Sequence, residues 1–277
     1  MHFDFHFTAV QTLWTLTFAG LLILLVVLLG RDRVSRYPWF TASMVFMALR
    51  MLASRLLFGK MAPLTSSEIF LVLADIGAVI SFLVVVEMAR RAFANGARMA
   101  SRTSWIVGTL ILLAVATAVV VRWGPWPPKE TVFAHSLLAN LRLMQLVAQK
   151  GDLLIDILIV ELGLLVAFCG RRFNAGWRSH TQKIVLGLST ASLAQIAVRI
   201  GMQLIANAPP PQTQEQYQHL TGLQEKLYNA NSVVFLLVVV WWIVCLWQDE
   251  PGTKSAEIQR EISVPEAEPT EPSSAGN

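Results

Sequence analysis

Seven long apolar stretches dominate this chain and restrict the folds open to it. Three of them are free of charged residues over at least 18 positions, and four hold a small number of embedded charges. Each is long enough to cross a hydrocarbon core of about 30 Å at about 1.5 Å per helical residue. The stretches lack the alternating pattern of barrel strands, so we expect an all-α bundle of transmembrane helices. The expected spans are 12–30, 37–58, 68–89, 104–122, 151–170, 184–206 and 228–248.

Composition supports a polytopic membrane protein with one folded domain. Hydrophobic residues make up 55% of the chain and charged residues only 14%, a balance that would not keep a soluble domain of this size in solution. After residue 248 the composition changes to Glu, Pro, Ser and Ala with few large apolar residues. We therefore expect a seven-helix domain over residues 1–248 and a disordered acidic tail over 249–277.

The distribution of Lys and Arg predicts the orientation. Basic residues concentrate in the short loops that follow the first, third and fifth spans, and such loops are cytoplasmic. The amino terminus is then outside and the carboxyl-terminal tail inside, with the first span retained as an anchor. This pattern also accounts for the net positive charge, so we predict no nucleic-acid partner. The loop residues are Arg31, Arg33 and Arg36; Arg90, Arg91, Arg98 and Arg102; Arg171, Arg172, Arg178 and Lys183.

Charged residues at similar depths in four spans are the main candidates for a functional site. Arg50, Asp75, Asp156 and Arg199 lie 14 to 16 residues from the basic residues at the inner ends of their spans. At about 1.5 Å per residue they share a layer roughly 21 to 24 Å from the inner side, with Glu161 deeper, near the midplane. A charge in hydrocarbon costs at least about 2.5 to 3.5 kcal/mol, so these side chains should face the bundle interior.

Helical spacing extends this layer. Gln195 shares a face with Ser192 and Arg199, and Asp152 lies one turn from Asp156. Two interpretations remain open. The charges could form closed pairs that specify helix packing, or they could line a water-filled outer cavity for a polar ligand or act as a proton-linked switch.

Other activities have little support in the sequence. The last span contains no lysine for a retinal Schiff base, and zinc-protease, nucleophile-elbow and phosphate-loop signatures are absent, so we do not predict an enzyme or a cofactor. His2, Asp4 and His6 could hold a metal, but we interpret them as an exposed terminus and predict no metal site.

The last span carries two further expectations. The run 212–226 should extend this span as a helix beyond the membrane. Trp241, Trp242 and Trp247 are expected to face lipid or to anchor the helix at the interface.

Four short motifs resemble the pattern of an unannotated bacterial family of seven-helix membrane proteins. The resemblance covers about residues 10 to 248 and implies the seven-helix architecture, while no activity or site residue follows from it. The motifs are Arg36-Tyr37-Pro38-Trp39-Phe40, Glu87-Met88-Ala89-Arg90, Asn140-Leu141-Arg142-Leu143 and Gly176-Trp177-Arg178.

These observations together favour a receptor- or sensor-like module of the bacterial inner membrane. Its outer polar cluster would receive a signal, and its basic inner loops and acidic tail would contact a cytoplasmic protein and anionic lipid headgroups. One alternative is a small solute or proton-coupled transporter that uses Glu161 as its coupling carboxylate. A third possibility is a structural assembly factor with a closed ionic core. The ligand is not identified by the sequence.

Overall fold

A computed structural model describes residues 9–57, 60–93, 108–109, 111–117, 137–169, 179–207, 209 and 211–249, and this part of the chain forms helices without any strand. The regions 1–8, most of 104–122, and 250–277 lie outside it, and with them the amino-terminal histidines, most of the fourth expected span and the expected tail. The long helices are α1 (Ala9–Gly30), α2 (Pro38–Leu57), α3 (Pro63–Phe93), α6 (Leu137–Cys169), α7 (His180–Ala206) and α8 (Gln214–Trp247).

Five of these helices have the length and composition of membrane spans, as in a multi-pass membrane protein. They are α1, α2, α3, α7 and α8. Helix α6 is long enough to span a membrane, but it is not one of these five apolar helices. Its last 18 residues hold three charged side chains, Asp152, Asp156 and Glu161. Residues 108–109 and 111–117, inside the fourth expected span, are also helical.

Local sequence explains where several helices begin. Helices α2 and α3 start at Pro38 and Pro63, and proline suits a first helical position because the missing N–H would have no partner there. Helices α7 and α8 begin after Ser179 and Thr213, whose hydroxyl oxygens accept hydrogen bonds from Gln182 N and Gln216 N. Helix α8 has 34 residues and is about 51 Å long, so the expected extension beyond the last span is confirmed.

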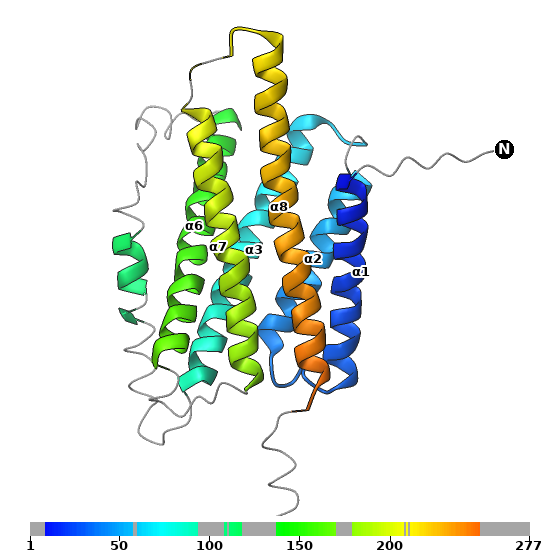
Figure 1. Ribbon diagram of the computed structural model, residues 1–277, viewed down its shortest axis with the longest axis vertical. Coiled ribbons are helices and arrows are strands. Elements are labelled where there is room, and N and C mark those ends of the chain that lie inside the picture. Colours follow the sequence, from blue (N-terminus) through cyan, green and yellow to red (C-terminus); the bar gives the residue numbers. More distant parts are fainter. Residues whose placement is uncertain are drawn as a thin grey trace, which may run out of the picture.

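The helices pack side by side in a ring, as Figure 1 shows. Each contacts its two neighbours in the order α1, α2, α3, α6, α7, α8 and back to α1, and α3 also contacts α7. We call the end that holds Ala9, Leu57, Pro63, Ala206 and Gln214 the upper end, as drawn in Figure 1, and the opposite end, with Gly30, Pro38, Phe93, His180 and Trp247, the lower end.

The hydrophobic core occupies the lower half of this ring. Where side chains are described, none is buried in α1 before Thr17, in α2 after Ala48, in α3 before Val84 or in α8 before Val238. Below those positions every helix contributes fully buried side chains. The upper half is therefore much less tightly packed than the lower half.

Trp242 lies at the centre of the packed half, and our expectation that it faces lipid is wrong. Its side chain is 0% exposed and meets the ring of Phe40 edge to face at 5.1 Å between centroids. Gly187 on α7 makes room for it, because a Cβ there would come within 2.7 Å of Trp242 Cε2. The adjacent Trp241 is 45% exposed, which agrees with a lipid-facing position. Helical geometry points successive side chains about 100° apart, so adjacent tryptophans cannot share one environment.

Helices α6 and α7 approach closely at a second glycine. A Cβ on Gly163 would lie 2.7 Å from Ser189 Cβ, so a larger residue would push the helices apart. The Ser189 hydroxyl is placed to donate to Ile159 O at 2.9 Å on α6 and to Val185 O at 2.8 Å on its own helix. This contact holds α7 against α6 just below the charged layer.

Buried polar groups tie the lower helix ends together. The Glu87 carboxylate on α3 accepts a hydrogen bond from Phe40 N at 3.0 Å and so caps the first turn of α2. Arg91 pairs with the same carboxylate at 3.5 Å and lies over the Tyr37 ring. The Tyr37 hydroxyl meets Thr181 Oγ1 at 3.1 Å, which joins α7 to this network.

The turn after α1 holds the carboxyl-terminal end of α8. Arg31 forms an ion pair with Asp249 at 3.1 Å and lies over the Trp247 ring. Arg33 donates to Gln248 O at 3.5 Å. The carboxyl-terminal end of α8 is thereby held at the α1–α2 turn.

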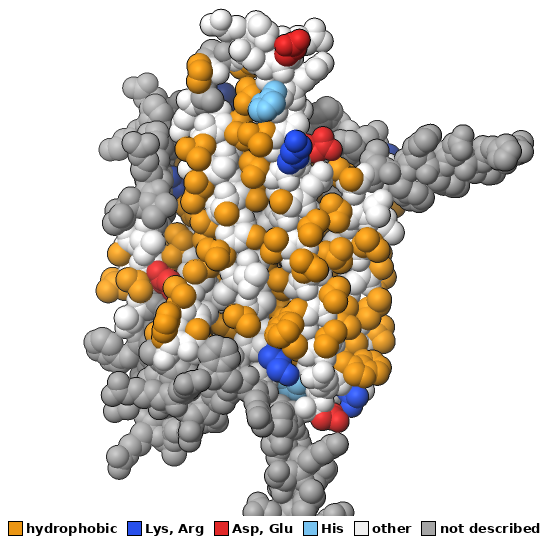
Figure 2. Space-filling model, viewed as in Figure 1, with side chains coloured by type: hydrophobic (Ala, Val, Ile, Leu, Met, Phe, Trp, Pro, Cys, Tyr) orange, Lys and Arg blue, Asp and Glu red, His pale blue; other side chains and the backbone are white. Residues whose placement is uncertain are grey.

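The outer surface is that of a membrane protein. In Figure 2, hydrophobic side chains cover most of the visible face between the two ends, and most charged side chains lie close to the ends. Such an apolar belt around a helical bundle is suited to contact with lipid.

Candidate functional site

Arg199 of α7 is at the centre of the candidate site. Its Nη2 atom lies 3.3 Å from Asp156 Oδ2 and 3.6 Å from Asp152 Oδ2, and its Nη1 atom donates to Gln149 O at 3.1 Å. The two aspartates lie one helical turn apart on α6, so both carboxylates face α7. The side chain of Asp156 is 15% exposed and that of Asp152 is 40% exposed. The carboxylates of this cluster are therefore only partly buried.

The polar face of α7 continues toward α8. Gln195 lies one turn from Arg199 and accepts a hydrogen bond from Asn231 Nδ2 at 3.0 Å. Ser192 is buried within hydrogen-bonding reach of the Asp156 carboxylate. The spacing of these residues at three and four positions brings them onto one helix face.

Arg50 of α2 is the second cation of the predicted layer. It interacts electrostatically with Asp152 across the ring, and its Nη1 atom lies 4.0 Å from the position of a Cβ on Gly77. Within the described part of the chain it forms no hydrogen bond and no ion pair shorter than 4.0 Å. Among the described residues, the Arg50 guanidinium therefore has only a long-range electrostatic partner.

The two other predicted carboxylates, Asp75 and Glu161, do not line the cavities described below. Asp75 on α3 is close enough to Asp152 for an electrostatic interaction, but it lines neither of the cavities described below. Glu161 faces away from this group, where Thr117 Oγ1 donates to its Oε1 atom at 3.3 Å. The structure thus brings Arg50, Asp75, Asp156, Gln195 and Arg199 into one neighbourhood and leaves Glu161 outside it.

A cavity of about 300 Å³, which we call the polar cavity, lies among these side chains. Five helices line it, with Trp242 and Met44 as apolar contributors. Its charged and amide side chains are Arg50, Asp152, Asp156, Gln195, Arg199 and Asn231. Its size falls at the lower end of the range for small-molecule sites, about 300 to 1,000 Å³.

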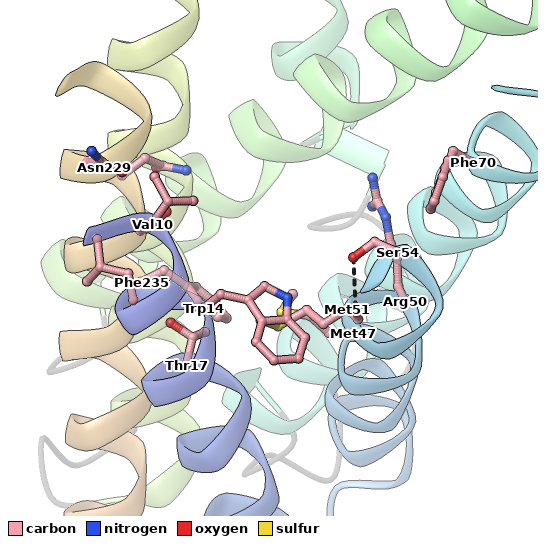
Figure 3. Close-up of a pocket in the computed structure, with 13 residues that line it drawn as sticks. Val10, Trp14, Thr17, Met47, Arg50, Met51, Ser54, Phe70, Asn229 and Phe235 are labelled. Atoms are coloured by element: carbon pink, nitrogen blue, oxygen red, sulfur yellow. Dashed lines mark hydrogen bonds between the residues drawn. The ribbon is translucent and has the colours of Figure 1, made fainter. Parts of the chain in front are cut away.

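A larger cavity of about 510 Å³, which we call the aromatic cavity, adjoins the first between α1, α2, α3 and α8. Figure 3 shows the Trp14 indole projecting into it, with Arg50 and Phe70 on one side and Phe235 on the other. Arg50 is the single charged residue among the thirteen that line it. Four residues, Met47, Arg50, Asn231 and Phe235, line both cavities.

Sequence reasoning did not identify the aromatic cavity or the full role of Asp152. The polar residues Asn229, Asn231 and Ser232 interrupt the apolar run of the last span, and this was the available signal for a cavity wall. Asp152 was predicted only to lie one turn from Asp156, and the structure shows that it also pairs with Arg199. Glu87 was named only as part of a short motif, and its capping of α2 was not predicted because it stands next to the basic residues that end the third span.

The chain matches no protein-family model, and no curated protein and no solved structure is significantly similar to it. Functional inference therefore rests on the geometry described above.

Proposed function

We propose that this protein is a receptor- or sensor-like seven-helix module of a bacterial inner membrane, with its upper end outside. The observation that carries this proposal is the polar cavity, in which Arg50 faces the Arg199–Asp152–Asp156 cluster. A structural ionic core would pair its charges fully and exclude space between them. Here Arg50 has no close partner among the described residues, and it lies with the other charged groups around a cavity.

The orientation follows from the basic residues at the lower end. Arg31, Arg33, Arg90 and Arg91 all lie near the lower helix ends. A cytoplasmic lower end satisfies the rule that positive loops stay inside, and it opens the cavities toward the outer leaflet. The resemblance to a bacterial family of seven-helix membrane proteins implies the same architecture and no activity.

Helix α7 provides a physical route from the cavity to the cytoplasmic side. Arg199 near its upper end binds α6, Ser189 in its middle touches Ile159 O, and Thr181 at its lower end meets Tyr37. A ligand that competes for Asp152 or Asp156 would change the α6–α7 contact at the upper end. The same rigid helix then transmits the change to the α2 end and the tail attachment.

A proton-coupled carrier remains the alternative, and one observation disfavours it. The coupling carboxylate of that scheme, Glu161, lines neither cavity and is bonded to Thr117. Uptake into proteoliposomes under a pH gradient distinguishes the two schemes. Flux that is abolished by Glu161→Gln supports a carrier, whereas a receptor gives ligand binding without flux.

Labelling of engineered cysteines tests the proposed cavity and its orientation together. In a background with Cys169→Ser and Cys245→Ala, Ser54→Cys adds a thiol to the wall of the aromatic cavity. We expect a membrane-impermeant maleimide to label it in intact cells. The matched control is Ser35→Cys, in the exposed turn after α1, which should react only after permeabilisation. Exchange of these two results would overturn the proposed orientation, and no labelling of Ser54→Cys in either condition would overturn an open cavity.

A further inference from the structure

Two cavities share a wall, and groups of opposite charge lie apart from each other in the space between the helices. On one side, the single guanidinium of Arg199 is shared by the carboxylates of Asp152 and Asp156, so these two groups have only one cation at close range among the described residues. On the other side, Arg50 has no ion pair within 4.0 Å among the described residues. A ligand that satisfied both sides would carry an anionic group and a cationic group.

The wall between the cavities gives such a ligand a third requirement. Arg50 lines the polar and the aromatic cavity alike, so an anion bound to it stands at their junction. Beyond that junction the aromatic cavity offers Trp14, Phe70 and Phe235, and its described lining residues include no second charge. An apolar substituent of the ligand would fill this space, and a second ionised group there would lack a partner.

We infer that the two cavities together bind a small zwitterion that carries an aromatic or branched aliphatic group, such as an α-amino acid. Its carboxylate accepts hydrogen bonds from the Arg50 guanidinium, a geometry for which arginine is well suited. Its ammonium donates to Asp152 and Asp156, which can accept more bonds than Arg199 supplies. This inference rests on the proposed outward-facing cavity and specifies its ligand class.

A single guanidinium also limits the anionic group. Dianionic phosphates are held at sites with several cationic or N–H donors, whereas Arg50 is the one cationic side chain among the described residues that line the aromatic cavity. A monovalent carboxylate is balanced by one arginine. The net charge of the bound zwitterion is zero, so its binding leaves the charge balance of the cluster unchanged.

Binding to the full-length protein in nanodiscs tests the ligand class with four probes. They are phenylalanine, leucine, 3-phenylpropionate, which lacks the ammonium, and 2-phenylethylamine, which lacks the carboxylate. Titration calorimetry gives the affinities, and a change in tryptophan fluorescence that is lost in Trp14→Phe reports occupancy of the aromatic cavity. We expect phenylalanine or leucine to bind at least about ten-fold more tightly than either singly charged probe, since each loses a hydrogen bond between charged groups. Equal affinity for a singly charged probe, or no binding of either amino acid at millimolar concentration, overturns the inference.

Two variants assign the charged ends of the ligand. Arg50→Gln should weaken phenylalanine and 3-phenylpropionate about ten-fold and leave 2-phenylethylamine unchanged, whereas Asp152→Asn should weaken phenylalanine and the amine. Arg55→Gln is the matched control on α2, because Arg55 lines neither cavity. Equal loss of all probes in Arg50→Gln, with an unchanged melting temperature, contradicts the assignment.

The two proposals can fail separately. If Ser54→Cys is labelled from outside and no amino acid binds, the proposal of an outward-facing cavity is supported and the proposed ligand class is wrong. If Ser54→Cys is not labelled in either condition, the proposed receptor cavity itself fails.

Discussion

Polar groups are closely paired and tightly packed in the lower half of the ring, whereas they are only partly paired in the upper half. In the lower half, Glu87 is directed at a backbone N–H and at Arg91, and large side chains fill the space around it. In the upper half, Arg199 is shared by two carboxylates, and Arg50 has no close partner among the described residues. Cavities of about 300 and 510 Å³ remain between the helices. The first arrangement fixes helix positions, and the second leaves charges available to a ligand.

This difference indicates that the lower half mainly stabilises the fold and that the upper half is suited to binding. Close packing restricts a region to one arrangement, because side chains in a dense core have few alternative positions. A region with cavities and partly paired charges has more than one arrangement of similar energy. We therefore expect substitutions in the lower half to change stability and those in the upper half to change binding.

The largest expected loss of stability comes from substitution of Trp242, at the centre of the packed half. Trp242→Ala removes a fully buried ring that contacts Phe40, and should lower the free energy of unfolding by about 3 to 5 kcal/mol. The neighbouring Trp241→Ala, at a 45% exposed position, should change it by about 0.5 kcal/mol or less. Denaturant titration followed by circular dichroism compares the two variants. Equal losses would contradict the packed lower half.

A smaller loss is expected when a methyl group is added beside the same ring. Gly187→Ala brings a Cβ within 2.7 Å of Trp242 Cε2, so α7 and α8 must separate, at a cost of about 1 to 3 kcal/mol. Gly222→Ala on α8 is the matched control, because nothing lies within 4 Å of its added Cβ. Alanine is the better helix former, so the control should be neutral or slightly stabilising. A neutral Gly187→Ala would show that the lower half can expand.

The third expected loss of stability comes from removal of the helix cap that Glu87 provides. Glu87→Ala leaves Phe40 N without its acceptor and should cost about 0.5 to 2 kcal/mol, as for other helix caps. Glu87→Gln keeps one side-chain acceptor and should lose less. The exposed Glu225 on α8 serves as the control for loss of a carboxylate. Thermal unfolding in detergent ranks the variants, and an order in which Glu225→Ala is worst would contradict a structural role for the cap.

Much of the helical architecture could be predicted from the sequence because hydrophobic length is a strong signal. The apolar runs 12–30, 37–58 and 228–248 correspond to α1, α2 and the lower part of α8. The intramembrane charges were also predictive, since the cost of exposing them to lipid directs Arg199 and Asp156 toward the bundle interior. That argument applies to each charge separately and depends only on depth.

Pairing and rotation about the helix axis could not be predicted in the same way. Depth placed Glu161 below the layer, near the midplane, but it could not show that the position five residues after Asp156 turns this side chain toward Thr117. Composition assigned Trp241 and Trp242 to one environment, although helix rotation separates them. The cavities depend on six helices packed in a ring, and no local pattern records the order of neighbours around it.

The smallest expected effect on stability, and the sharpest test of the contrast between the halves, is at Arg50. Arg50→Gln removes a charge that is exposed in the cavity and forms no close ion pair in the described chain, so the free energy of unfolding should change by about 0.5 kcal/mol or less. Arg199→Gln in the same layer removes two ion pairs and leaves Asp156, only 15% exposed, without its cation, so it should lose clearly more. Denaturant titrations of the two variants in the same detergent provide the comparison. Equal losses would mean that Arg50 stabilises the fold as Arg199 does, and the upper half would then be a closed ionic core that needs no ligand.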